Sequence, residues 1–358
     1  MLKKWVCVFS ALLITLGVSG CRTSGYERFR TELDGLFDTN ITVIGYARSK
    51  GEFDTYANII FERMGELHIL YDIYNAYDGT NNLHTVNQNA GIAPIEVSGD
   101  IIDMLLLAKD GYELSGGTVN IAMGAVLRIW HEYRADGSEN PDNAELPPMG
   151  KLMEAAMNTD INDLVIDEAA GTVFLRNPGM SLDVGAVAKS YAAGVAAKAV
   201  EEAGAESLLL NAGGSVTAIG KPLDGERERW GVGIPDPDLT AASSQNLADT
   251  VYYRDLTLSC SGGYHRFYII DGQKYHHIID PATLMPATRY KQVAVIHPDS
   301  GLADILSTAL FILPYEDGAA LAERSGAEVL WIDADGNWMA TDGYAAMSKE
   351  LGGYSAVG

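Results

Sequence analysis

The sequence predicts an α+β fold, in which mixed or antiparallel sheets pack against helices. Strand patterns follow one another in runs, above all over residues 230–279, and helical patterns are grouped between these runs. A doubly wound sheet would instead alternate one strand with one helix along the chain. Without its leader the chain keeps about 335 residues, enough for one large domain or two intimate lobes.

The first half is expected to hold one long strand and two long helices, followed by two short strands. The long strand covers residues 39–47, and apolar residues at helical spacing predict a helix over 53–77. Ser98 is the expected N-cap of a second helix that runs to about residue 114. Polar and turn-forming residues predict surface loops, at 135–148 and 236–246. The short strands are expected at 164–166 and 173–175.

Two helices and several strands are expected in the second half. Small residues over 184–203 predict a helix that Gly204 closes. Ser300 is the expected N-cap of another helix, which ends before Pro314. Asp271 and Gly272 predict the turn of a hairpin. The expected strands are, in order, 207–211, 215–219, 268–270, 275–278 and 292–297.

The N-terminus has the pattern of an export signal. Lys3 and Lys4 precede an apolar run, residues 5–18, that is too short to span a bilayer comfortably. The small residues before Cys21 resemble a bacterial lipobox, where the chain is cut before the cysteine and the cysteine is lipidated. A plain secretory signal with an accidental cysteine is the alternative.

The lipobox interpretation predicts where the mature protein lies and how it is divided. Residues 1–20 are expected to be the signal peptide, and Cys21 is expected to carry a lipid that holds the protein at the cell membrane, on the extracytoplasmic side. Residues 21–36 are expected to form a tether, 37–345 the folded domain and 346–358 a C-terminal tail.

Charge and cysteine usage exclude some classes of partner. The net charge of −23 argues against nucleic acid, because phosphate binding needs a basic surface. An anionic substrate would need local positive charge from a lysine or a metal. Cys7 leaves with the signal and Cys21 is acylated, so Cys260 has no disulfide partner. Cys260 is expected to be a small packing residue rather than a nucleophile.

Two segments suit an anionic ligand. In residues 183–191 the expected helix start offers free backbone N–H groups, and Lys189 adds positive charge. In Asn211-Ala212-Gly213-Gly214, two glycines after a strand let the backbone approach a ligand or simply turn the chain. An ordinary surface lysine and an ordinary turn explain these segments as well when each is taken alone.

A third segment joins residues 261–264 to the pair His276 and His277 and to Asp280. His277 is a candidate general base, because imidazole titrates near neutral pH. A histidine pair in a strand is more often one buried and one exposed residue without chemistry. Zinc is not expected, because no third ligand stands at a suitable spacing.

The fourth segment carries Asp304 and Thr308 in an otherwise apolar helix. Side chains four residues apart share one helix face, and a carboxylate beside a hydroxyl suits a hard cation such as Mg²⁺. A buried aspartate costs a core helix free energy unless it is paired or metal-bound. A capping or hydrogen-bonded pair is the alternative.

Together, the four segments resemble the ApbE family of FAD:protein FMN transferases. The resemblance covers roughly residues 37–340, and its motifs stand in the family's order, at 183–189, 211–214, 261–264 with 277–281, and 303–311. The chain departs from the family pattern at Leu284, where glycine is usual, at Cys260, where threonine is common, and at Gly263, where the residue is usually polar.

The resemblance implies an α+β fold related to the T-fold, with the active site between two intimate lobes. It implies a Mg²⁺ ion held by Asp304, Thr308 and the backbone carbonyl of Ala186. It also implies catalytic roles for His277 and Lys189. The FAD-binding residues that it implies are Tyr74, Asn75, Lys189, Asn211, Gly213, Gly214, Ser261, Gly262 and His277.

The implied reaction is Mg²⁺-dependent transfer of the FMN part of FAD to a Thr or Ser hydroxyl of an exported acceptor flavoprotein, with release of AMP. The acceptor would be a subunit of a membrane redox complex or an extracellular flavoprotein. Two other functions stay open, which are hydrolysis of FAD to FMN and AMP by the same residues and storage of FAD by a lipoprotein without chemistry. A structural lipoprotein without a ligand would leave the shared motifs unexplained.

Overall fold

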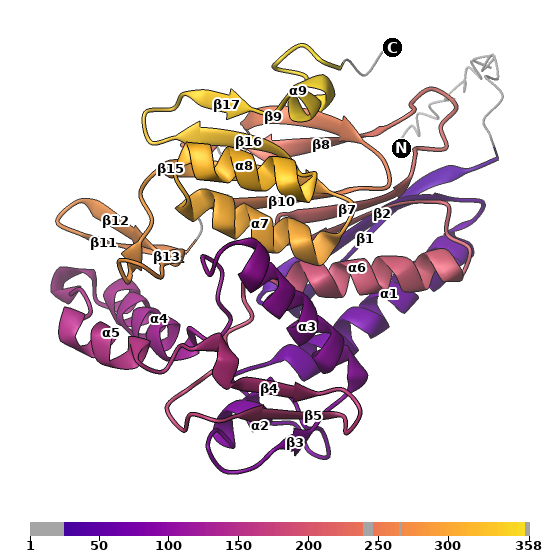
Figure 1. Cartoon of the computed structure of the whole chain (residues 1–358). Helices are drawn as coiled ribbons and strands as arrows, with labels where there is room; N and C mark the ends of the chain where they lie inside the picture. Colours follow the sequence, from indigo (N-terminus) through magenta and orange to yellow (C-terminus); the bar gives the residue numbers. More distant parts are fainter. Residues whose placement is uncertain (1–24, 239–245, 265, 355–358) are drawn as a thin grey trace, which may run out of the picture.

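An eight-stranded antiparallel sheet organises the protein (Figure 1). The structure is a computed structural model that describes residues 25–238, 246–264 and 266–354; Cys21 and most of the loop predicted at 236–246 lie outside these residues. The strands are, in spatial order, β1 (Glu27–Leu36), β2 (Thr39–Ala47), β6 (Ser207–Ala212), β7 (Ser215–Gly220), β10 (Thr257–Gly262), β15 (Tyr290–His297), β16 (Glu328–Asp333) and β17 (Trp338–Ala340). The predicted α+β class is confirmed.

Helices and smaller sheets of two or three strands accompany this sheet. The helices are α1 (Lys50–Tyr71), α2 (Leu83–Gln88), α3 (Gly99–Leu114), α4 (Gly124–Glu139), α5 (Met149–Ala156), α6 (Ala188–Glu202), α7 (Ser300–Ile312), α8 (Tyr315–Ser325) and α9 (Asp342–Met347). The remaining strands are β3 (Ile95–Glu96), β4 (Leu164–Asp167), β5 (Thr172–Leu175), β8 (Trp230–Pro235), β9 (Leu247–Tyr253), β11 (Phe267–Ile270), β12 (Gln273–His276), β13 (Ile279–Asp280) and β14 (Met285–Pro286).

The sheet is buried on both faces, which explains its apolar strands. Along β15, Val293 and Val295 enter the core under α1, α6 and α7, whereas Ala294 and Ile296 enter a second core. Successive strand residues point to opposite faces, so one apolar run serves both cores. The second core is closed by the β8–β9 hairpin and α9 (Figure 1).

A third, smaller core lies beside the sheet and joins α4 and α5 to the β11–β14 segment. It contains Met123, Val126, Trp130, Leu152, Tyr268 and Ile279. The indole N–H of Trp130 donates to the carbonyl of Leu284 over 2.9 Å, so the burial of its polar atom is compensated. This core fixes α4 against the β11–β12 hairpin, and both elements contribute to the site described below.

Helices α6 and α7 pack closely and antiparallel to each other. A side chain at Gly194 of α6 would collide with Ser300, and one at Gly301 of α7 would meet Tyr191. Because the two helices run in opposite directions, Asp304 and Thr308, which are further along α7, lie beside the N-terminal end of α6. Small residues at the contact allow this approach, which brings the turn before α6 close to the face of α7 that carries Asp304 and Thr308.

The predicted ends of the folded domain are wrong at both termini. The expected tether, 21–36, includes β1, which pairs with β2 along its whole length and therefore belongs to the sheet. As an edge strand β1 is half-exposed, and its charged residues concealed it in the sequence. The folded part continues into the expected tail, because Ser348 is buried and its hydroxyl donates to Asp249 over 2.6 Å, whereas residues 349–353 are exposed. No helix within the described residues is both long and apolar enough to cross a bilayer.

Several predicted helix boundaries also need correction. Helix α1 ends at Tyr71, six residues early, because the Asp72 carboxylate accepts the backbone N–H groups of Tyr74 and Asn75 and forms a turn. Helix α6 begins at Ala188 rather than at residue 184. The N-cap of α7 is Asp299, which accepts from the N–H of Leu302, and not Ser300. Residues 135–139, predicted as loop, continue α4.

Candidate active site

Asp304 is the most unusual charged residue of the core. Its side chain is on α7 and the residue is only 8% exposed. One carboxylate oxygen, Oδ1, accepts from the Ser259 hydroxyl over 2.8 Å, and the other, Oδ2, is buried and has no partner among the described residues. A buried carboxylate oxygen without a donor is costly, so this atom fits a cation. The bond to Ser259 is of the kind that the hydrogen-bonded alternative expects, and the unpartnered Oδ2 is an atom that a cation could bind.

Thr308 and Ala186 are the other two predicted metal ligands, and that prediction stays a prediction. Thr308 is partly exposed and stands one turn after Asp304 on α7. Ala186 belongs to the turn that precedes α6, the helix that packs against α7. The described residues hold no group of three or more His, Cys, Asp and Glu side chains that could bind a metal. The predicted donor set contains a single carboxylate, that of Asp304.

Lys189 and the glycine turn lie next to each other. The ammonium group of Lys189, in the first turn of α6, donates to the carbonyl of Gly213 over 3.4 Å. Asn211 accepts the N–H of Gly214 over 3.2 Å and thereby shapes the turn between β6 and β7. Gly213 has a φ of 57° and a side chain there would collide with Thr39, so glycine is needed for the turn itself. The structure shows a turn-forming role for Asn211 and Gly213.

Ser261 and Gly262 end β10, next to α7. The Ser261 hydroxyl is 2.8 Å from that of Ser307, which donates to the carbonyl of Asp304 over 2.9 Å. This chain ties the end of β10 to the helix that carries Asp304. Cys260 faces the second core, and burial raises the pKa of its thiol to about 12, with opposing effects from nearby Lys189 and Asp304. At that pKa the thiol stays protonated, as expected for a packing residue.

The two histidines have different surroundings. The His276 ring packs edge-on against Phe311 of α7, with its Nε2 2.8 Å from the carbonyl of Ala287 and its Nδ1 accepting from Ile278. The Nδ1 atom of His277 is buried and lacks a partner among the residues described. Burial lowers the pKa of His277 to about 3, assisted by His276, Arg266 and Arg134. His277 is therefore neutral at neutral pH and can accept a proton.

Tyr74 and Asn75 lie in the loop after α1. The loop is organised around Asp72, which also accepts from the Asn75 amide and the Tyr77 hydroxyl over 2.9 Å each. The Tyr74 ring is 59% exposed and its centroid is 5.8 Å from that of His131 on α4. An exposed aromatic ring in this place offers a stacking surface. The side chain of Asn75 is instead used to hold the loop.

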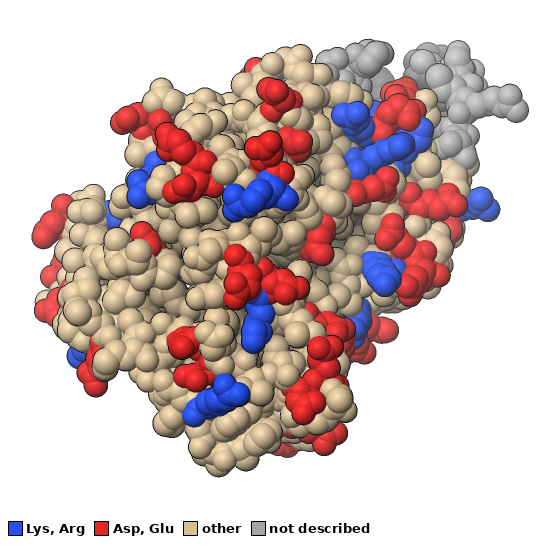
Figure 2. All heavy atoms as spheres, in the orientation of Figure 1, with Lys and Arg blue, Asp and Glu red and all other residues tan. Residues whose placement is uncertain are grey.

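Sequence reasoning missed two arginines near His277 and gave no role to Asp183, which opens the motif at 183–189. Arg134 is on α4, Arg266 directly precedes β11, and Asp183 lies in the turn before α6. Burial lowers the pKa of Arg134 and so does the charge of Arg266, while burial raises the pKa of Asp183 against the pull of both arginines. Figure 2 shows how acidic the visible surface is elsewhere, with red side chains spread over the face. Two arginines remote in sequence give no local motif, so only the fold brings them together.

Comparison with known proteins identifies the family. The family model of ApbE matches residues 37–331. The FAD:protein FMN transferase of Treponema pallidum is 35% identical over 342 residues, which are 92% of this chain and 90% of that protein. One from Klebsiella pneumoniae is 29% identical over 263 residues, 73% of this chain and 78% of that protein. This chain belongs to the ApbE family.

Solved structures of ApbE proteins share the fold. The crystal structure of the ApbE protein of Thermotoga maritima has a TM-score of 0.75 at 24% identity and covers 90% of this chain and 99% of its own. The flavin transferase ApbE of Vibrio cholerae has a TM-score of 0.74 at 22% identity, with 90% and 99% covered. The predicted family and fold class are thus confirmed.

One departure from the ApbE pattern has a structural explanation. Leu284 stands where the family usually has glycine, and its φ of 60° is in the left-handed region that glycine favours. The N–H of Leu284 donates to the carbonyl of Asp280 over 2.8 Å, which closes the loop. The loop therefore keeps the backbone shape that a glycine would adopt, at a cost of roughly 1–2 kcal/mol for the leucine.

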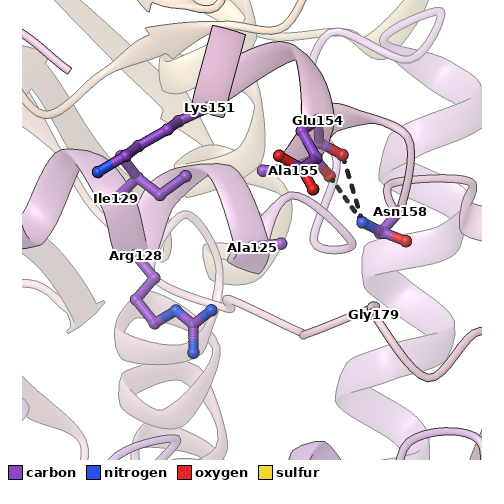
Figure 3. A pocket seen from close by; sticks show the side chains of 8 residues that line it. All are labelled: Ala125, Arg128, Ile129, Lys151, Glu154, Ala155, Asn158 and Gly179. Carbon is purple, nitrogen blue, oxygen red and sulfur yellow. Dashed lines mark hydrogen bonds between the residues drawn. The ribbon is translucent and has the colours of Figure 1, made fainter. Parts of the chain in front are cut away.

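A surface hollow of about 250 Å³ between α4 and α5 is separate from these residues (Figure 3). Its lining includes Arg128 and Lys151, and the Asn158 amide donates to the carbonyls of Glu154 and Ala155. None of the eight lining residues is a predicted site residue. In this ApbE protein the chemistry is thus expected at the junction of α6, α7, α4 and the β11–β12 hairpin, and not in the hollow.

Proposed function

We propose that the protein transfers the FMN part of FAD to a Thr or Ser hydroxyl of an acceptor protein and releases AMP. The observation that carries the proposal is a pair of buried, unpartnered atoms, Asp304 Oδ2 and His277 Nδ1, in a chain of this family. The first suits a cation and the second can take a proton. Relatives named FAD:protein FMN transferases, one of them 35% identical over nearly the whole chain, support the same reaction.

Magnesium is the metal that the donor set fits best. Asp304, Thr308 and the carbonyl of Ala186 supply three oxygen ligands, and hard cations prefer oxygen. When bound there, Mg²⁺ would offset the negative charge of a diphosphate. Since only one ligand is a carboxylate, we expect metal affinity to rise strongly when FAD is present.

The FAD diphosphate is expected beside Lys189 and the turn at Gly213 and Gly214, where positive charge and an exposed backbone meet. Ser261 and Gly262 at the end of β10 line the same side. The flavin ring is expected near the exposed Tyr74 and the loop of Asn75. These assignments combine the FAD-binding roles predicted from the sequence with the positions of the same residues in the fold.

His277 is proposed as the general base. The acceptor hydroxyl attacks the phosphorus on the FMN side, a new O–P bond forms, and the P–O bond to the AMP part breaks. His277 takes the hydroxyl proton on Nδ1 or through a water molecule and returns it to solvent. Its low pKa keeps it neutral before FAD binds, and the negative charge of the substrate would raise that pKa toward neutrality.

The predicted export signal supports a proposal for the acceptor and the place of action. We propose that Cys21 is lipidated and that the protein works on the extracytoplasmic side of the cell membrane. Its acceptor would then be an exported flavoprotein, either a subunit of a membrane redox complex or an extracellular one.

The first test is to incubate the chain lacking residues 1–21 with FAD and Mg²⁺, with and without an exported candidate acceptor. AMP release and acceptor mass are measured. A mass gain of one FMN on Thr or Ser, with equivalent AMP, is expected. AMP and free FMN with an unmodified acceptor would indicate an FAD pyrophosphatase, and bound FAD without AMP would indicate a passive carrier.

A further inference from the structure

Arg266 and His277 lie opposite each other at the open end of the β11–β12 hairpin. The last paired residues of the hairpin are Phe267 and His276, so Arg266 and His277 are the next pair outward. The pair Tyr268 and Tyr275, one step inward, has ring centroids 5.9 Å apart on one face of the hairpin. Since strand side chains alternate, Arg266 and His277 continue that same face.

Helix α4 brings Arg134 to this face. A side chain at Gly137 would touch the ring of Tyr268, so α4 packs on the tyrosine face of the hairpin. Arg134 precedes Gly137 by three residues and therefore lies on the same side of the helix. Its guanidinium Nη2 is 3.1 Å from Nδ1 of His131, whose ring neighbours Tyr74. Arg134 and Arg266 thus flank His277 from two elements.

The two arginines carry positive charge that the protein does not neutralise. Within residues 25–238, 246–264 and 266–354, neither forms an ion pair with a carboxylate, although nine such pairs occur elsewhere in those residues. Asp183 faces them at longer range, and its carboxylate accepts from the N–H of Gly185 over 2.9 Å. Burial lowers the pKa of Arg134, and the neighbouring charge of Arg266 lowers it further. An oxyanion would relieve this repulsion.

We propose that Arg134 and Arg266 form a clamp for the phosphoryl group on the FMN side of FAD. The inference rests on the proposed function, which makes His277 the base for the attacking hydroxyl. That hydroxyl must stand between His277 and the phosphorus that it attacks, so groups flanking His277 flank this phosphoryl group. Lys189 belongs to a different part of the fold, where its ammonium group donates to the Gly213 carbonyl and acts on Cys260. Guanidinium groups match the oxygens of a phosphoryl group that gains charge during transfer.

The test compares FMN with riboflavin, which differ by the phosphate in question. Binding of each to the full chain in detergent is followed by flavin fluorescence with EDTA present, so that metal plays no part. The unmodified protein is expected to prefer FMN by at least about tenfold. In Arg134→Gln, Arg266→Gln and the double variant this preference should fall toward one, with riboflavin affinity unchanged. Arg128→Gln, an exposed arginine on another face of α4, is the matched control and should keep the preference.

Three results would overturn the clamp. Variants that keep the full FMN preference would remove the arginines from the phosphate site. Variants that only raise the KM for the acceptor would assign them to a carboxylate of that protein instead. A protein that binds neither FAD nor FMN would overturn the proposed function together with the clamp, whereas FAD turnover with an unchanged FMN preference would overturn the clamp alone.

Discussion

The two sides of the candidate site are built in different ways. The α7 side, with Asp304, Thr308 and Lys189, belongs to buried helices packed on the main sheet. The hairpin side, with Arg134, Arg266 and His277, belongs to a small core and to loop ends beside that sheet. The α7 side presents hard oxygen atoms in a rigid setting, and the hairpin side presents cations and a neutral imidazole at a more exposed edge. We infer that the first side holds the metal and offers Lys189 to the diphosphate, and that the second side holds the FMN-side phosphoryl group and accepts the proton.

The largest expected effect tests the α7 side. Asp304→Asn keeps the size of the side chain and an acceptor for Ser259 but removes the charge that a cation needs. We expect Mg²⁺-dependent AMP release to fall by at least about 100-fold, with the melting temperature little changed. Ser259→Ala is the matched control and should lose less, because the carboxylate stays. Activity retained by Asp304→Asn at low Mg²⁺ would remove Asp304 from the metal site.

The pH dependence tests the hairpin side. With its pKa lowered to about 3, free His277 is already neutral at pH 5.5, whereas an ordinary histidine, with a pKa near 6.5, would be largely protonated there. The acid limb of kcat/KM, which follows the free enzyme, should therefore lie well below pH 6.5. The acid limb of kcat should lie higher, because bound phosphate offsets the nearby cations. The measurement is AMP release from pH 4 to 8; a kcat/KM limb at about 6.5 would contradict the low pKa.

A smaller effect is expected for the lysine on the α7 side. Lys189→Met should weaken FAD binding by about tenfold, the usual size for losing one charged hydrogen-bonding group. The control is Lys198→Met, which changes an exposed lysine nine residues further along α6. Equilibrium titration with FAD measures both. If the two variants bind FAD equally well, Lys189 is an ordinary surface lysine.

The smallest effect concerns the loop that supports the hairpin side. Leu284→Gly relieves the left-handed strain at this position but removes side-chain packing against the third core. These effects oppose each other, so we expect the unfolding free energy to change by no more than about 1 kcal/mol, with transfer activity kept. Chemical denaturation measures the change. A destabilisation of several kcal/mol would mean that packing, and not backbone shape, dominates there.

Sequence patterns predicted the strands, caps and turns that depend on interactions between residues close together in the chain. The strand at 39–47, the cap at Ser98 and the turn at Asp271 and Gly272 all appear in the structure as expected. Asp304 and Thr308 could be paired in advance, because helical spacing alone places them on one face. The edge strand β1 was missed because its exposed face is charged, and α1 was predicted too long because Asp72 was not recognised as a turn former.

The family, the α+β class and the candidate catalytic and binding residues could be predicted from the sequence, since each is encoded in local spacing or in motifs that keep their order. Tertiary structure alone decided which atoms are left without partners and which charges meet. Asp304 Oδ2 is unpartnered only because α7 packs on β10, and Arg134 meets Arg266 only because α4 packs on the hairpin. Burial and electrostatics depend on distances between remote segments, and those distances exist only in the folded chain.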